Sequence, residues 1–277
     1  GAHNWQAMAV DEEAGVVYIP AQDNPLIYGM SEDWTQSGLY KRNPGGWNTG
    51  LEFGRITQLV VDNIADQPTP KGYLKAFDPL TGEDKWVVEI PQYWNGGVLS
   101  SAGGLVFQGD ALGMFTAYDK DTGEALWQFN TYTSMLAPPI TFEIDGEQFV
   151  SVLTGTGGGD LFGGEPLPPV AEHASLTYNN YGRLLVFKIG GTEQLPVPTV
   201  RDRSIPVQAD LVASNDQIAA GERHYNNYCA VCHGLAVRSG GSIPDLRRMS
   251  EGTHTAFNQI VQDGLLAANG MAAFDDV

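Results

Sequence analysis

The feature that most constrains the fold is an internal repeat. Residues 72–86 read GYLKAFDPLTGEDKW, and residues 113–127 read GMFTAYDKDTGEALW, at an offset of 41 residues. Seven positions are identical in the two copies: Gly72/Gly113, Ala76/Ala117, Asp78/Asp119, Thr81/Thr122, Gly82/Gly123, Glu83/Glu124 and Trp86/Trp127. Repeats of roughly 40–45 residues built from short strands are typical of propeller blades. The chain is therefore expected to contain similar β units arranged side by side.

Each copy predicts a β-hairpin. A first strand ends at an Ala-aromatic-Asp step, a turn runs through Thr-Gly, and a second strand carries Trp86 or Trp127. The aspartate and threonine side chains are suited to bonding the turn amides, and glycine is suited to a positive φ. We expect both tryptophan rings to pack between neighbouring units.

Weaker copies of the unit extend this pattern along residues 1–190. Residues 15–18, 104–107 and 148–151 each look like an outer strand, Leu59–Val61 falls where another is expected, and Gly182–Ile189 resembles a hairpin start. With four strands per unit, residues 1–190 predict about four blades. We interpret the fold class as mainly β, a partial β-propeller.

The remainder of the chain follows different rules. Pro196, Pro198 and Pro206 lie in a segment without periodicity, so 191–213 is interpreted as a linker. Residues 214–277 predict a small all-α domain. Ser214 and Gln217 have capping-box spacing at its start. A second helix is expected after Thr255, ending near Gly264.

Composition excludes several classes of function. The formal net charge is −18, which repels nucleic acid and anionic membranes and favours basic partners. Glycine is abundant, at 34 of 277 residues, and only 17% of residues are charged, which favours turn-rich β structure. No apolar run is long enough for a membrane helix. The opening GAHNW lacks signal-peptide features, so we expect a piece of a longer chain or a processed form.

The only two cysteines carry the chemical signal. Cys229, Cys232 and His233 form Cys-Ala-Val-Cys-His, the pattern for covalent attachment of c-type haem. Residues three apart face the same way on a helix, so both thiols would reach the haem vinyl groups. A structural zinc site needs four ligands, and a thioredoxin-like dithiol is expected after a strand. The helical context favours haem over both.

The sixth iron ligand is expected downstream. Candidates are Met249, His254 and Met271, and we favour Met271 because its loop follows a helix. Ligation by methionine raises the reduction potential, which suits an electron acceptor. The Pro244 carbonyl is expected to accept the ring N–H of His233. Arg247 and Arg248 are interpreted as solvated rather than as partners of haem propionates.

These motifs together resemble the quinohaemoprotein alcohol dehydrogenases, over nearly the whole chain. The similar segments are GAHNW at 1–5, GVVYIPAQ at 15–22, YWNGG at 93–97, both tryptophan repeats, CAVCHG at 229–234 and IPDLRR at 243–248. The resemblance implies an eight-bladed propeller around pyrroloquinoline quinone (PQQ), with a calcium or lanthanide ion beside it. It also implies a catalytic aspartate that accepts the alcohol proton, and electron transfer from PQQ to haem c.

Roles in this chain follow from the same resemblance. Asn4 and Trp5 match the family's Asn-Trp pair that contacts PQQ, and Trp94 is expected to line the pocket. Gly159 ends the loop Gly155–Gly159, which matches a cofactor-binding loop of the family. Thr156 stands where the family usually has tryptophan, which leaves the shape of the substrate pocket open.

The resemblance implies an enzyme that oxidises alcohols in the periplasm and passes electrons to a small cytochrome, a copper protein or a quinone. The adjacent-cysteine disulfide, the metal ligands and the catalytic aspartate of the family are expected in an earlier half, outside this chain. The fragment alone is expected to be inactive. One alternative is an electron-transfer module whose propeller only docks a partner. Another is a scaffold propeller of outer-membrane assembly, against which the haem motif argues.

Overall fold

A computed structural model describes residues 2–25, 28–31, 38, 49–52, 56, 63, 68–156, 173–208, 212–239 and 243–275. The chain divides into two compact units. The first comprises Gly1–Leu26 and Pro68–Asp202, and the second comprises Ile27–Gln67 and Arg203–Val277. The sequence predicts a continuous propeller domain over 1–190. In the structure, residues 27–67 within that range are assigned to the second unit instead.

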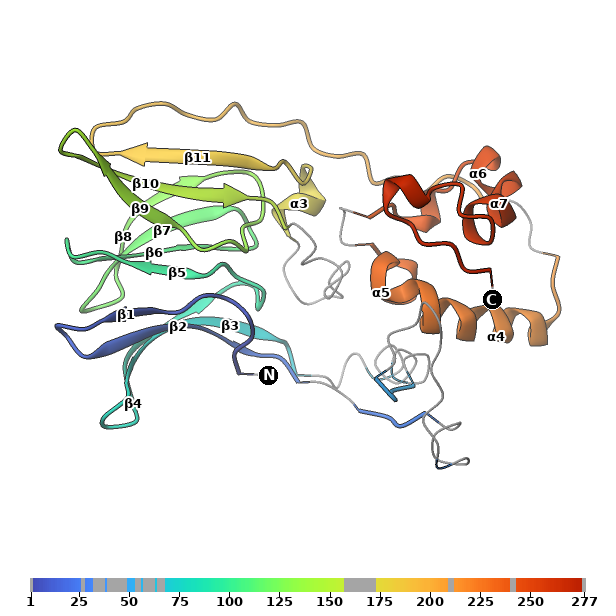
Figure 1. Cartoon of the computed structure of the whole chain (residues 1–277), viewed down its shortest axis with the longest axis horizontal. Helices are drawn as coiled ribbons and strands as arrows, with labels where there is room; N and C mark the ends of the chain where they lie inside the picture. The colour runs from blue at the N-terminus through green and yellow to red at the C-terminus, as the bar shows by residue number, and fades with distance from the viewer. Residues whose placement is uncertain are drawn as a thin grey trace. The chain divides into compact units, whose positions relative to one another are not determined.

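The first unit is built from three antiparallel sheets, drawn one above another in Figure 1. Their strand orders are β1-β2-β3-β4, β5-β6-β7-β8 and β11-β10-β9. The strands are β1 (Ala9–Asp11), β2 (Val16–Asp23), β3 (Lys71–Asp78), β4 (Glu83–Ile90), β5 (Val98–Ser100), β6 (Leu105–Gly109), β7 (Met114–Asp119), β8 (Ala125–Asn130), β9 (Ile140–Ile144), β10 (Glu147–Thr154) and β11 (Arg183–Lys188). The described residues therefore form two four-stranded meanders and one three-stranded sheet. About four blades were expected, and Leu59–Val61 lie outside the described residues.

The two copies of the repeat form equivalent hairpins, β3–β4 and β7–β8. The register shifts at the same point of each copy, directly after the shared alanine. Asp78 and Asp119 each accept two backbone N–H groups of their turn, at 2.9 to 3.3 Å. Gly82 and Gly123 have φ of +77° and +75°. The predicted hairpin chemistry is confirmed in both copies.

Two apolar cores fill the spaces between the sheets. Their buried members come from alternate positions of the strands, as the period-two burial of β2 illustrates. The first core contains Val16, Tyr18, Leu74, Ala76, Ile90, Val98, Val106 and Tyr118. The second contains Phe107, Phe115, Ala117, Met135, Val150 and Val152. Each core joins two successive sheets, which is the packing expected of propeller blades.

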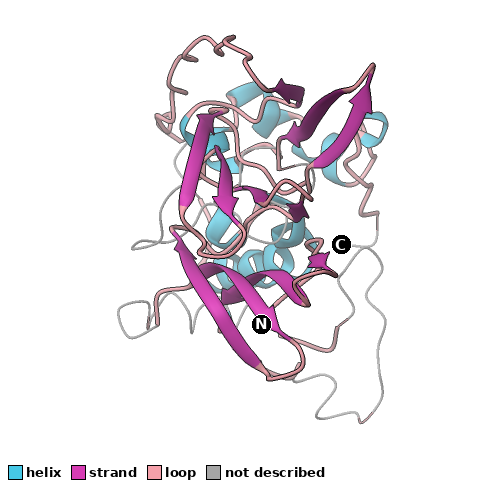
Figure 2. Ribbon diagram, turned by 90° about the vertical axis from the view of Figure 1, so that its left-hand side faces the viewer, coloured by secondary structure: helices cyan, strands magenta, loops and turns pink. Residues whose placement is uncertain are grey.

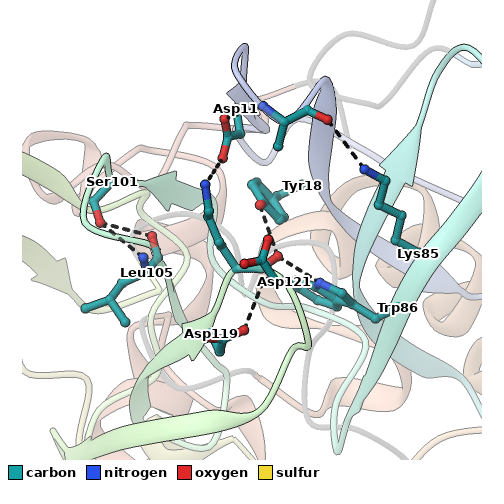
Figure 3. Close-up of polar contacts among 10 residues, drawn as sticks. Asp11, Tyr18, Lys85, Trp86, Ser101, Leu105, Asp119 and Asp121 are labelled. Atoms are coloured by element: carbon teal, nitrogen blue, oxygen red, sulfur yellow. Dashed lines mark hydrogen bonds and ion pairs between the residues drawn. The ribbon is translucent and has the colours of Figure 1, made fainter.

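The Trp86 side chain links the first sheet to the second, as the repeat predicts. Its Nε1 donates to the Lys120 carbonyl at 2.9 Å, and a Cβ on Gly123 would lie only 2.8 Å from its ring. The Tyr18 hydroxyl donates to the same Lys120 carbonyl at 3.2 Å, and the Lys120 ammonium pairs with Asp11 at 3.0 Å. Figure 3 shows these contacts, which fix the second hairpin on the first sheet.

The second repeat tryptophan is covered less completely. The Trp127 ring contacts Phe187 of β11 with centroids 5.3 Å apart, yet 41% of Trp127 remains exposed. One reason is that 191–208 contain no helix or strand, so β11 has no hairpin partner among the described residues. The far face of this third sheet also exposes apolar side chains: Ile140, Ile144, Leu153, Leu184 and Val186.

The second unit contains most of the helical residues, drawn in cyan in Figure 2. Among its described residues, the helices are α4 (Asn215–His224), the π-helical turn η3 (Tyr225–Cys229), α5 (Ala230–His233), η4 (Leu235–Val237), η5 (Leu246–Arg248), α6 (Glu251–Thr255), α7 (Phe257–Val261) and η6 (Ala267–Asn269). A further short helix, α3 (Ala174–Thr177), belongs to the first unit. The predicted capping box of Ser214 and Gln217 is present at the start of α4.

The helical run predicted after Thr255 is confirmed as α7, but a further helix, α6, precedes it. A helix already begins after Ser250, whose hydroxyl accepts the N–H of Thr253 at 3.1 Å. Thr255 is the last residue of that helix, and α7 follows after Ala256, whose ψ of 9° interrupts the helical run. The Ser250 cap satisfies the first free N–H groups, which decides where the helix starts. Gly264 takes a φ of +71° three residues after α7 ends.

Candidate functional site

The haem-attachment motif lies where three helical segments follow one another. Cys229 ends the π-helical turn η3, and Cys232 and His233 close the short helix α5. Cys229 is half-buried, Cys232 is exposed, and His233 is buried at 8% exposure. Burial, and then the neighbouring Cys232, raise the pKa of the Cys229 thiol. Both cysteines are free, as they must be before they form thioethers.

The His233 ring is held by the segment that the sequence singles out for this role. Its Nδ1 lies 2.9 Å from the Pro244 carbonyl oxygen, and because a carbonyl oxygen can only accept, Nδ1 carries the proton and donates. The lone pair is then on Nε2, which is the nitrogen available to a metal. The expected Pro244 contact is confirmed, and the tautomer that it fixes fits an axial haem ligand.

The interpretation of the two arginines as solvated is wrong. Arg247 Nη2 lies 2.7 Å from Asp245 Oδ2, and Arg248 Nε lies 3.7 Å from the same oxygen. Although burial alone would raise the pKa of Asp245, the hydrogen bonds and charges of the two arginines lower it. The acidic neighbour two and three residues upstream is the signal that points to this pairing. The ion pairs stiffen the segment that carries the Pro244 carbonyl.

Met271 lies in a loop that returns towards the haem-attachment segment. Gly270 takes a φ of +94°, and three residues after Met271 the Phe274 N–H donates to the Val261 carbonyl at 2.8 Å. The Phe274 ring meets the Tyr228 ring, beside Cys229, with centroids 6.3 Å apart. The loop and the Cys-Ala-Val-Cys-His motif are thus brought together by these rings.

The other two candidate iron ligands are placed differently. His254 Nε2 lies 3.1 Å from Gln208 Oε1 at an exposed position, so this ring nitrogen is already engaged. Met249 is the residue at which η5 ends, and its backbone N–H bonds to Leu246. Met271 therefore remains the ligand that we predict.

In the first unit, Trp5 forms one side of an open pocket of about 460 Å³. Half of its side chain is exposed, at 53%, and its backbone N–H bonds to the Asn4 side chain at 2.9 Å. The other lining residues come from three segments: Leu136–Pro138, Leu153–Thr156 and Gly182–Leu184. Most of these residues are apolar or lack a long side chain. The pocket therefore suits a flat, mostly apolar group lying against an indole face.

Trp94 supports this pocket and is not among the residues that line it. It is buried at 6% exposure, and its ring lies 6.0 Å from the Trp5 ring and 6.1 Å from the Tyr93 ring. Its backbone N–H bonds to Gln92 Oε1 at 3.1 Å. Trp94 was expected to line the pocket directly. Its ring instead contacts the ring of Trp5, which does line the pocket.

The glycine-rich loop is only partly within the described residues. Thr156 lines the pocket, and its backbone N–H donates to the side-chain oxygen of Asn180 at 2.9 Å. The same Asn180 oxygen accepts from the Ser175 hydroxyl at 3.1 Å. Gly159 lies outside the described residues. Sequence reasoning missed Asn180 and Ser175, because no spacing connects them to the loop that they hold.

The partly buried carboxyl of Asp110 gives this unit a pH-dependent stability. Asp110 Oδ1 accepts the Met114 N–H at 2.8 Å, and Ala111 N–H points to the Asn95 side chain. Burial raises the pKa of Asp110 to about 6, from 3.8, despite the backbone hydrogen bonds that oppose it. Its contribution to stability is therefore present below pH 4 and is lost as the pH rises through 6.

We expect Asp110→Asn to stabilise the protein at pH 8 and to change little at pH 4. The shift corresponds to at most about 3 kcal/mol. The measurement is the unfolding midpoint from pH 4 to 8. Asp119→Asn is the matched control with the opposite sign, because hydrogen bonds from Thr122 lower the pKa of Asp119. A midpoint difference for Asp110→Asn that does not vary with pH would contradict this assignment.

None of the helices in the described part of the chain is long and apolar enough to cross a membrane. No group of three or more His, Cys, Asp or Glu side chains within those residues is placed to hold a metal ion.

Two family models match separate parts of the chain. Residues 88–150 match the PQQ model described as glucose/ethanol/alcohol dehydrogenase, beta-propeller domain. Residues 216–277 match cytochrome C oxidase, cbb3-type, subunit III. The first match covers strands of the second and third sheets, and the second covers the Cys-Ala-Val-Cys-His segment.

Known proteins resemble the chain over its whole length. Quinohemoprotein alcohol dehydrogenase ADH IIB of Pseudomonas putida is 40% identical, over 100% of this chain and 38% of its own length. The structure of ADHIIG from Pseudomonas putida HK5 is 34% identical with a TM-score of 0.82, covering 100% of this chain and 39% of that one. The Comamonas testosteroni quinohemoprotein alcohol dehydrogenase structure is 31% identical with a TM-score of 0.75, covering 99% and 38%. The chain thus spans little more than a third of the length of these relatives.

Proposed function

We propose that this chain, which belongs to the quinohaemoprotein alcohol dehydrogenase family, carries the haem c and one wall of the PQQ site of an alcohol-oxidising enzyme. The observation that carries the proposal is the pairing of two sites in one chain. One is the Cys-Ala-Val-Cys-His motif with His233 oriented by Pro244, and the other is the Trp5 pocket between propeller strands.

The residues of the helical unit fit a covalently bound haem. Cys229 and Cys232 would form the two thioethers, and His233 Nε2 would bind the iron. The Pro244 carbonyl keeps the His233 proton on Nδ1, so that Nε2 stays available. Met271 would supply the second axial ligand. Such an iron accepts single electrons and passes them on, and the protein residues set its potential.

The Trp5 pocket fits the planar PQQ ring system. Trp5 lines the pocket and is about half exposed, and a Cβ built on Gly182 would meet nothing within 4 Å, which leaves this wall open. When bound, PQQ supplies a hydride acceptor for the alcohol. Trp5 would stack on the ring, Asn4 fixes the Trp5 backbone, and Trp94 backs the indole from the buried side. Gly159 is proposed as a further contact.

The remaining parts of the proposal concern the whole enzyme. In this proposal, the earlier part of the parent protein supplies the catalytic aspartate and the ligands of a calcium or lanthanide ion. The substrate is a small alcohol, oxidised to an aldehyde or ketone. The electron acceptor is a small cytochrome, a copper protein or a quinone. The periplasm is the proposed location, because covalent haem attachment requires the maturation machinery found there.

The test uses the full-length parent protein loaded with haem, calcium and PQQ. Primary, secondary and cyclic alcohols are mixed with it, and the haem absorbance is followed by stopped flow. We expect at least one alcohol to reduce the haem only when PQQ is present. A haem that accepts electrons from a chemical reductant but from no alcohol would instead support the electron-transfer module. The same protein without PQQ is the control.

A further inference from the structure

The Tyr225 hydroxyl contacts the turn that follows the haem-binding histidine. It donates to the Gly234 carbonyl oxygen at 2.6 Å. Gly234 is the residue directly after His233 and the first residue of the 234–237 turn. One side chain thus ties the start of this turn to the helix that precedes the cysteines.

This turn has an unfavourable backbone conformation. Ala236 and Val237 have φ of 52° and 63°, in the left-handed region that residues with a Cβ disfavour, β-branched valine most of all. Gly234 has a φ of +80°, and a Cβ there would lie 1.9 Å from the Arg238 carbonyl oxygen. Such a turn persists only when surrounding contacts hold it. The Tyr225 hydroxyl supplies one of those contacts.

The helix preceding the cysteines is modified where Tyr225 lies. The Ala230 N–H bonds to the Tyr225 carbonyl, five residues back, so η3 is a π-helical turn between α4 and α5. Such a turn inserts one extra residue and rotates the side chains that precede it relative to those that follow. It therefore changes the direction of Tyr225 relative to Cys229 and His233, and Tyr225 reaches across to Gly234.

We propose that Tyr225 is a positioning residue for His233. Its hydroxyl holds the 234–237 turn so that the imidazole N–H remains directed at the Pro244 carbonyl. The two contacts act from opposite sides: the hydroxyl fixes the chain just after His233, and Pro244 fixes the ring at 2.9 Å. The inference rests on the proposed haem c, because it concerns the orientation of the iron ligand.

The positioning has an electronic consequence. A well-directed N–H···O=C bond makes the imidazole a stronger donor to iron, which favours Fe(III). Loss of the Tyr225 hydroxyl would loosen the turn and weaken this bond. The ring proton would then exchange with solvent more often, and the reduction potential would rise. Neither effect requires any loss of covalent haem.

The experiment compares Tyr225→Phe with the unchanged full-length protein, both loaded with haem. Histidine is labelled with ¹⁵N, and deuterium exchange of the His233 Nδ1–H is followed by NMR at its hyperfine-shifted resonance. We expect exchange to accelerate about tenfold, as for loss of one hydrogen bond to a buried carbonyl. The potential should shift upward, with one haem per chain retained. Tyr181→Phe is the control, because it also removes a hydrogen-bonded hydroxyl, in the first unit.

A second substitution separates positioning from general stability. Ala236→Gly relieves the left-handed strain, because glycine adopts that φ without cost. Added to Tyr225→Phe, it should restore most of the slow exchange and the original potential. The proposal would be overturned by the following combined result. Exchange is faster in Tyr225→Phe, adding Ala236→Gly does not slow it again, and the acceleration equals the loss of global unfolding stability.

The unchanged protein provides a test that needs no variant. If one opening exposes the turn and the ring, the Gly234 N–H, which bonds to the Ala230 carbonyl at 2.9 Å, and the His233 Nδ1–H should exchange with the same denaturant dependence. Different dependences would overturn the proposal, as would unchanged exchange and potential in Tyr225→Phe. Absence of covalent haem from the unchanged protein would contradict the proposed function itself, which keeps the two failures distinct.

Discussion

Cys229→Ala together with Cys232→Ala is expected to abolish covalent haem while leaving the propeller sheets folded. Each thioether is formed by adding one cysteine thiol across one haem vinyl group, and these two thiols are the only ones in the chain. The single variants should each retain one thioether. Their pyridine haemochrome α band should move to longer wavelength, because one vinyl group remains conjugated. Mass spectrometry of protein exported to the periplasm should show one haem in the unchanged protein and none in the double variant.

Two measurements accompany this experiment. Ser239→Ala is a suitable control, because it changes a small buried polar side chain of the same unit without touching a thiol. It should retain the full mass of one haem. Acid–acetone extraction of haem from the unchanged protein would contradict covalent attachment. Far-ultraviolet circular dichroism of the double variant should keep its β signal, since the sheets belong to the first unit.

Met271→Ala is expected to remove a sulfur ligand from the iron and to lower its reduction potential. A thioether stabilises Fe(II) relative to Fe(III), so its loss favours the oxidised form. The Soret and α bands should shift. In the full-length enzyme, alcohol should reduce the haem more slowly, while reduction of PQQ proceeds at its original rate. Stopped-flow absorbance at the haem and quinone bands measures both events in one experiment.

Met249→Ala is the matched control for this prediction. It makes the same chemical change in the same unit, and it should leave the haem spectrum unaltered. An unchanged spectrum in Met271→Ala would transfer the ligand role to Met249 or His254. Loss of the PQQ signal together with the haem signal would mean that Met271 supports folding rather than ligation.

The parts of this protein that are local in sequence could be predicted from it. The hairpins follow from aspartate, threonine and glycine at fixed offsets within one turn, and all of their bonds span a few residues. The Pro244 contact was likewise expected, because a metal-binding histidine donates its other ring N–H to an acceptor such as a backbone carbonyl. The predicted position of Trp86 between two sheets is confirmed because the repeat supplies its partner.

Contacts between distant segments could not be predicted in the same way. The lining of the Trp5 pocket combines four segments, and nothing in the spacing of Leu136, Leu153 and Leu184 connects them. Trp94 resembles a pocket residue in sequence, but it is buried, with its ring 6.0 Å from the ring of Trp5, which lines the pocket. The Tyr225 contact depends on a π-helical turn, and no pattern of apolar residues in the sequence predicts such a turn. In each case, tertiary packing decides what a local motif leaves open.

The contact between Trp86 and Gly123 means that the unit of sequence duplication is offset from the unit of packing. The tryptophan of one copy needs the glycine of the following copy, because any side chain there would collide with its ring. Two adjacent copies must therefore change together. If a single hairpin were transplanted into another propeller, its tryptophan ring would pack against a turn of the host protein. Its glycine would likewise lie against a strand of the host protein. Grafting experiments should accordingly cut within the hairpin, between Gly123 and Trp127, so that each interlocking pair moves as one piece.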